Sequence, residues 1–200
     1  MFVSPALALD PPPGGGYPNK TTVLGEDALF HHITGNHDVA VGYHALYNGP
    51  TGFQNTAIGS ETLYNNREAF NTGIGWRALY SNTTGASKTA IAPTALYDNT
   101  TGNYNCAIGY SALGHNTDGS RNIAIGQWAL AYNVGGDNDT ATGFEALFRN
   151  SDGVYNMATG NYALCNIPQG ITTPALALAR CTTTQPITYQ SHRKPNHGIL

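Results

Sequence analysis

Residues 71–121 read NTGIGWRALYSNTTGAS, KTAIAPTALYDNTTGNY and NCAIGYSALGHNTDGSR, three consecutive stretches of equal length that align without a gap. A glycine marks the same position in most copies of this unit along the chain. The glycine column comprises Gly25, Gly42, Gly59, Gly75, Gly109, Gly126, Gly143 and Gly160. Ala92 fills the one gap, and every step in the column is equal except that from Gly59 to Gly75, which is one residue shorter. Such a fixed period is the sequence signature of a repeat array.

Leucine occupies a second column, four residues after the glycine position, in all nine copies. The residue before this leucine is almost always alanine, and the residue before the glycine is mostly isoleucine or valine. We expect the leucines to stack into a continuous structural core, each contributing about 2 kcal/mol through burial. The core is predicted to contain Leu46, Leu63, Leu79, Leu96, Leu113, Leu130 and Leu147.

The length and residue types of the unit predict its fold. Its seventeen residues cannot hold two helices and a connection, but they can hold two short strands and two turns. Thr-Ala-Ile and Ala-Leu-Tyr favour strands, whereas Asn-Thr-Thr-Gly favours turns because Gly and Asn accept positive φ. Stacking equivalent strands about 4.8 Å apart predicts an all-β, parallel β-solenoid of nine coils over residues 19–170. A Pro/Gly-rich linker with a signal-peptide remnant (1–18) precedes it, and a basic, irregular tail (171–200) follows.

Alternation along the Thr-Ala-Ile segment predicts two different faces. Thr56 and Ile58 lie on one side of their strand and Ala57 lies on the other. We expect the alanine columns, including Ala107 and Ala124, to be half-exposed on a single roll. Small side chains allow backbones to approach closely, so this face predicts a homo-oligomer, specifically a homotrimer.

The amino-acid composition limits the kinds of molecule that this chain is expected to bind. Only 10% of the residues are charged and the net charge is −3, which excludes a nucleic-acid partner. No apolar run approaches the ~20 residues of a membrane helix, so membrane insertion is not expected. Ala6-Leu7-Ala8 matches the small-x-small rule for signal cleavage, which indicates a secreted or cell-surface protein.

The repeated motif resembles those of a known class of surface proteins. Asn55-Thr56-Ala57-Ile58-Gly59 is similar to the head repeats of trimeric autotransporter adhesins. The stretch from Asn71 to Gly85 is similar to repeats of long bacterial cell-surface proteins. The resemblance covers roughly residues 19–170. It implies a left-handed β-roll, assembly of three chains, and binding to a glycan or an extracellular matrix protein.

The sequence does not indicate a catalytic, cofactor or metal site. A hydrolase would need acids or a nucleophile–base pair at fixed places, yet Glu61, Asp118 and Glu145 fall in variable turn columns. His31, His32, His37 and His44 lie close in sequence, and zinc spacing is conceivable, but we interpret them as exposed turn residues. We therefore predict a protein that is not an enzyme and has no cofactor.

An aromatic column follows the leucine column and includes Tyr47, Tyr64, Tyr80 and Tyr97. One interpretation is a ladder of rings that stabilises the sheet, and the other is a surface that binds sugars or proteins.

The favoured function is a structural or adhesive segment of an exported bacterial surface fibre. A saccharide-binding or saccharide-processing solenoid is the alternative. An ice-binding solenoid is the third, although its threonine column is broken by residues such as Cys106 and Met157.

Overall fold

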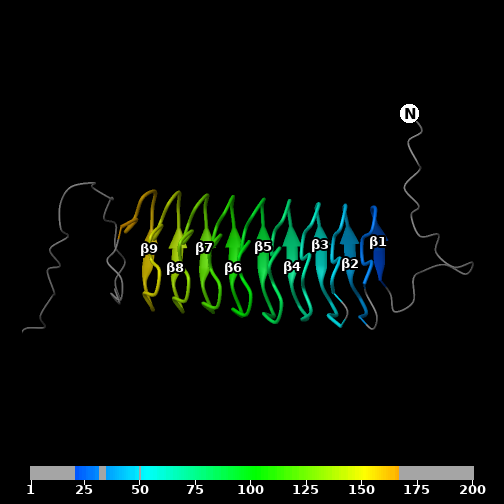
Figure 1. Cartoon of the computed structure of the whole chain (residues 1–200). Coiled ribbons are helices and arrows are strands. Elements are labelled where there is room, and N and C mark those ends of the chain that lie inside the picture. The colour runs from blue at the N-terminus through cyan, green and yellow to red at the C-terminus, as the bar shows by residue number, and fades with distance from the viewer. Residues whose placement is uncertain (1–20, 32–34, 50, 167–200) are drawn as a thin grey trace, which may run out of the picture.

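The computed structural model describes residues 21–31, 35–49 and 51–166, which form a stack of similar coils (Figure 1). The strands are β1 (Thr22–Leu24), β2 (Val39–Val41), β3 (Thr56–Ile58), β4 (Thr72–Ile74), β5 (Thr89–Ile91), β6 (Cys106–Ile108), β7 (Ile123–Ile125), β8 (Thr140–Thr142) and β9 (Met157–Thr159). They pair in sequence order in one parallel sheet. The predicted all-β parallel solenoid is therefore confirmed, whereas the segments predicted for 1–18 and 171–200 lie outside the described residues.

The register of the sheet places equivalent residues of successive coils side by side. Ala90 pairs with Ala107, and Ala107 pairs with Ala124. The one short coil keeps this register, because Ala57 still pairs with Gly73 although the unit between them lacks a residue. The missing residue is absorbed in the turn between Asn66 and Asn71, where Asn66 Nδ2 donates to the Glu68 carbonyl at 2.7 Å.

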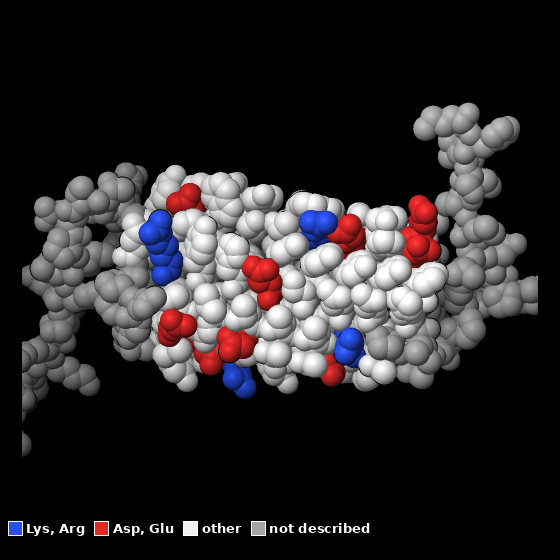
Figure 2. Space-filling view, in the orientation of Figure 1, with Lys and Arg blue, Asp and Glu red and all other residues white. Residues whose placement is uncertain are grey.

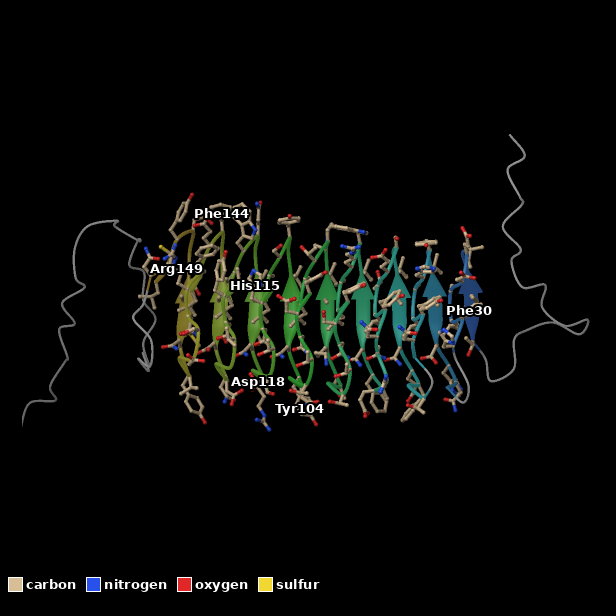
Figure 3. All side chains as sticks on the ribbon, viewed as in Figure 1. Phe30, Tyr104, His115, Asp118, Phe144 and Arg149 are labelled. Carbon is tan, nitrogen blue, oxygen red and sulfur yellow. The ribbon has the colours of Figure 1, made fainter. Side chains whose placement is uncertain are left out.

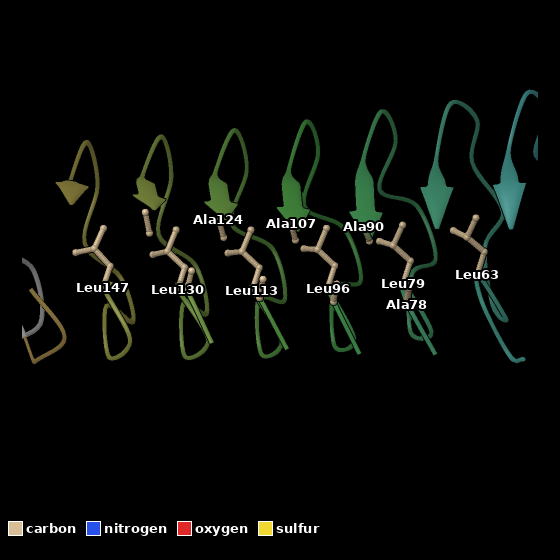
Figure 4. Close-up of a cluster of buried hydrophobic side chains, with 14 of the residues drawn as sticks. Leu63, Ala78, Leu79, Ala90, Leu96, Ala107, Leu113, Ala124, Leu130 and Leu147 are labelled. Atoms are coloured by element: carbon tan, nitrogen blue, oxygen red, sulfur yellow. The ribbon is translucent and has the colours of Figure 1, made fainter. Parts of the chain in front are cut away.

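The interior of the solenoid is a leucine spine lined by alanine (Figure 4). All seven leucines predicted for the core are buried. The alanines of the strands lie inside with them, and Ala57, Ala107 and Ala124 have 0% exposure. The expectation of a half-exposed alanine face is therefore wrong. So short a coil encloses only a narrow space, which the leucines almost fill, so the facing positions accept nothing larger than a methyl group.

A pair of compensating residues shows how tightly this interior is packed. Thr62 replaces alanine in the column before the leucine, and Gly73 replaces alanine in the facing strand column. A Cβ atom on Gly73 would lie 2.6 Å from Thr62 Cγ2. The extra methyl group on one side is thus matched by a missing one on the other.

The Ala-Leu-Tyr segment is a turn and not the second strand that we expected. Its leucines have positive φ, for example 53° at Leu96 and 51° at Leu113. This conformation costs roughly 1–2 kcal/mol for a residue with a side chain. Hydrogen bonds between coils continue through the turn, because Leu96 N donates to the Ala112 carbonyl at 3.0 Å. These bonds and the burial of each leucine offset the backbone cost.

Two buried asparagine columns hold the other turns together. Asn116 Nδ2 donates to Asn99 Oδ1 and to the Gly119 carbonyl, both at 2.9 Å. In the second column, Asn105 Nδ2 donates to the Gly119 carbonyl at 2.7 Å, while its Oδ1 accepts from the backbone N–H of Asn122 at 2.9 Å. A side-chain amide suits this position because it donates and accepts at once.

Candidate binding surface

The aromatic column that follows the leucines forms a stack of rings along the solenoid. The four predicted tyrosines lie in one stack, which Phe30 extends toward the β1 end (Figure 3). From Phe30 to Tyr97, successive ring centroids are 5.5, 5.1, 5.1 and 5.3 Å apart, with interplanar angles between 6° and 20°. Desolvation, and then the neighbouring Tyr47 and Tyr80, raise the pKa of the Tyr64 hydroxyl. The predicted site residues are thus brought together as a half-buried, five-ring surface.

The stack stops at Tyr97 because the next two positions of the column are Gly114 and Ala131. A groove of about 430 Å³ lies at this break, between Tyr97 and Phe148. Its volume falls within the range of small-molecule sites, which are concave, apolar and equipped with a few polar groups. Both tryptophans of the chain, Trp76 and Trp128, line it.

Sequence reasoning missed most of the groove. Two of its lining residues, Trp76 and Tyr110, occupy the position directly after the glycine column, as does Phe144 next to the groove, and Trp128 lies one residue further along its coil. The ring centroids of Tyr110 and Trp128 are 6.1 Å apart, and those of Trp128 and Phe144 are 5.7 Å apart. The available signal was the pair of small residues in an otherwise aromatic column. These two small residues predict a groove only when it is known which neighbouring columns face the same side of the solenoid.

Charged side chains are few on the face that Figure 2 presents. Beside the rings, Arg77 and His115 each lie against a carboxylate. Arg77 donates to Glu61 and lies over the rings of Trp76 and Tyr80, at 4.8 and 5.3 Å from the centroids. The side-chain hydrogen bond to Glu61 raises the pKa of Arg77. His115 Nδ1 lies 2.7 Å from Asp98 Oδ2. The surface therefore presents rings with few charged side chains between them.

Two of the histidines considered for metal binding lie beside the ring stack. The rings of His31 and His44 both pack against Tyr47, with centroids 5.1 and 4.5 Å away, and His44 Nε2 lies 3.6 Å from Asp27 Oδ2. His32 lies outside the described residues. Within 21–31, 35–49 and 51–166, the structure has no group of three His, Cys, Asp or Glu residues placed to hold a metal ion.

Three buried ionisable residues, Asp38, Lys88 and Asp139, replace asparagine in the second polar column, and sequence reasoning missed all three. Burial lowers the pKa of Lys88 to about 7, against a smaller opposite effect from Glu68. Burial also raises the pKa of Asp139 to about 6, against hydrogen bonds from Asn156 and Asn150. Lys88 Nζ donates to the Gly102 carbonyl at 3.0 Å, but it has no oxygen to accept from Asn105. Lys88 therefore keeps only the donor half of the asparagine pattern, whereas the Asp139 carboxylate only accepts, from the Asn156 N–H and from Asn150 Nδ2, both at 2.7 Å.

Comparison with known proteins gives no match to a protein-family model, to a curated protein or to a solved structure. Among the residues that the structure describes, no helix has the length and apolarity needed to cross a membrane. The function is therefore argued from the geometry of the surface.

Proposed function

We propose that this chain is a non-catalytic, adhesive segment of an exported bacterial surface fibre, and that the aromatic face is its binding surface. The observation that carries the proposal is the stack of five rings from Phe30 to Tyr97, continued by the groove beyond it. Exposed aromatic rings offer large, rigid contact area to sugars and proteins at a small entropic cost. The rigid stack of coils suits a protein that must present a surface at a distance.

Adhesion to surfaces tests this proposal. Beads coated with the full chain should bind to immobilised polysaccharides or matrix proteins, and the double variant Tyr64→Ala/Tyr80→Ala should bind at least about tenfold less. Tyr155→Ala is the matched control, because Tyr155 is exposed but lies outside the stack. Equal binding by all three proteins would contradict the role of the stack. Release of reducing ends from a polysaccharide by the chain would favour the saccharide-processing alternative, and thermal hysteresis would favour ice binding.

We also propose that the fibre segment is a homotrimer, assembled through the outer face of the sheet and not through the alanines. This face carries a row of isoleucines, of which Ile58, Ile91 and Ile125 are 39%, 36% and 40% exposed. Extended exposed apolar patches of this kind mark interaction surfaces. Because one such row follows each chain, three rolls can bury their rows against one another.

A charged substitution in this row should dissociate the assembly. We expect Ile91→Asp to convert an oligomer of the full chain into a monomer in light scattering, with an unchanged circular-dichroism spectrum. Tyr104→Asp, which alters an exposed ring outside the sheet, should leave the mass unchanged. A monomeric wild-type chain at micromolar concentration would refute the trimer while leaving the adhesive role to be judged by the bead assay.

A further inference from the structure

We propose that the groove at the break in the ring stack binds a pyranose ring of a neutral saccharide, stacked on the face of Tyr97 that Tyr80 does not cover. This inference rests on the proposed adhesive function and assigns to it a defined site and a class of ligand. The stack of rings indicates the shape of the molecule that would fill the groove. Within the unbroken part, Tyr47, Tyr64 and Tyr80 are each covered by rings on both faces.

One face of Tyr97 lacks such a cover. Tyr80 stacks on its other face at 5.3 Å and 6°, but the next two positions are Gly114 and Ala131. Phe148 resumes the column three coils beyond Tyr97, which corresponds to roughly 14 Å at the ~4.8 Å spacing of strands. Two successive positions of the column therefore lack a ring, and the position next to Tyr97 suits an occupant that is ring-sized and apolar on its faces. A pyranose chair has this form, since its C–H groups lie on its faces and its hydroxyls lie at its rim.

The polar groups of the groove suit the rim of such a ring. Thr94, Ser111 and Glu145 line the groove and can donate to or accept from sugar hydroxyls. The hydroxyls of Thr94 and Ser111 lie 2.7 Å apart, so a ligand hydroxyl can join an existing pair. An aromatic side chain from a protein partner would fill the same space but would leave these groups without new partners.

The charge of the groove favours a neutral sugar over an acidic one. Arg77 and His115 are the basic side chains among the lining residues, and each lies against a carboxylate, Glu61 and Asp98 respectively. Glu145 adds a further negative charge to the lining. An anionic saccharide would therefore meet net repulsion, because Glu61 already matches the charge of Arg77 and Glu145 has the same sign as the ligand.

Intrinsic fluorescence can report this site directly, because the chain has two tryptophans and both line the groove. The full chain is titrated with cellohexaose and with maltohexaose while tryptophan emission is recorded. Polygalacturonate oligomers and the peptide Gly-Tyr-Gly serve as the acidic and aromatic comparisons. We expect a saturable change in emission with at least one of the two neutral oligosaccharides and with neither comparison.

Two filling variants and one truncation test the position of the site. Gly114→Tyr and Ala131→Tyr supply the side chain that the column carries in other coils, so each should reduce affinity at least tenfold. Gly114 does not have positive φ, but an added Cβ would lie 3.1 Å from the Ser111 carbonyl oxygen, so the turn must shift by a few tenths of an ångström, and Ala131→Tyr is the second filling variant for this reason. Tyr97→Ala should reduce affinity similarly by removing the stacking face. Tyr155→Ala, outside the groove, should bind as the wild type does, and thermal melting verifies that every variant is folded.

The outcomes separate this inference from the broader proposal. It is overturned if neither neutral oligosaccharide gives a saturable change, if Gly-Tyr-Gly alone does, or if both folded filling variants bind like the wild type. If the groove fails while bead adhesion persists and depends on Tyr64 and Tyr80, the adhesive function stands without this site. Loss of both responses in the wild type refutes both proposals.

Discussion

Replacing Ala124 by tryptophan should destabilise the solenoid by at least about 3 kcal/mol, since overpacking a filled interior strains both side chains and backbone. Ala124 is 0% exposed and lies between Ala107 and Ala141 in the sheet. The compensation between Thr62 and Gly73 shows that even one added methyl group in this column must be removed from the opposite side. A tryptophan cannot be accommodated by such an exchange.

Ile125→Trp is the matched control, because Ile125 is the next residue of the same strand and faces outward at 40% exposure. Urea unfolding of both variants at low protein concentration compares them, and Ile125→Trp should remain within about 0.5 kcal/mol of the wild type, as exposed substitutions usually do. If Ala124→Trp keeps its stability and loses only its oligomeric state, the alanines face outward as the sequence had suggested.

Replacing Lys88 by asparagine should stabilise the protein, by on the order of 5 kcal/mol near pH 6. Lys88 is buried, and its pKa falls from an ordinary 10.5 to about 7. Each unit of this difference corresponds to ~1.4 kcal/mol. Between these two values the unfolded chain binds more protons than the folded chain, so wild-type stability rises with pH. The advantage of Lys88→Asn should therefore be full below pH 7 and should vanish toward pH 10.5. Chemical unfolding at pH 6, 8 and 10 measures it.

Asp139→Asn is a control of opposite sign in the same column. The pKa of Asp139 rises from 3.8 to about 6 on folding, so the folded chain binds more protons between these values and wild-type stability falls as pH rises through them. Asp139→Asn should thus stabilise the protein above pH 6 and have little effect below pH 4. A pH-independent difference for both variants would show that these changes act through packing and not through charge.

Much of the fold could be predicted from the sequence because equivalent residues recur in every coil and occupy the same environment. The glycine and leucine columns located the strands and the spine, and the tyrosine column predicted the ring stack. Alternation showed that Ala57 and Ile58 face opposite sides, but it could not show which side is inside. The deciding quantity was the width of the coil, which admits leucine from one wall and only alanine from the other. The positive φ of Leu113, 51°, could not be predicted from the sequence either, because leucine prefers extended or helical backbone conformations.

The groove was less predictable for a different reason. Gly114 and Ala131 matter because they lack the aromatic ring that most other coils carry at this position. A small residue does not by itself indicate a binding site. Trp128 belongs to a turn column whose residue type varies from coil to coil. Such variation is typical of solvent-exposed turns, so the sequence did not indicate a binding site there. Only the three-dimensional register showed that this edge and the broken ring stack enclose one space.

The pairing of each strand with only its immediate neighbours has a consequence for how such a chain can change in length. Free energy in such an array is approximately a sum of contributions from individual units and from adjacent pairs. Gain or loss of one whole repeat unit by slippage between near-identical gene segments would leave every remaining pair intact and alter the reach by ~4.8 Å. Variation outside the units of β4 to β8 would then adjust the length while preserving the groove, whereas loss of the unit that contains Gly114 would shorten the molecule and alter its binding site in a single event.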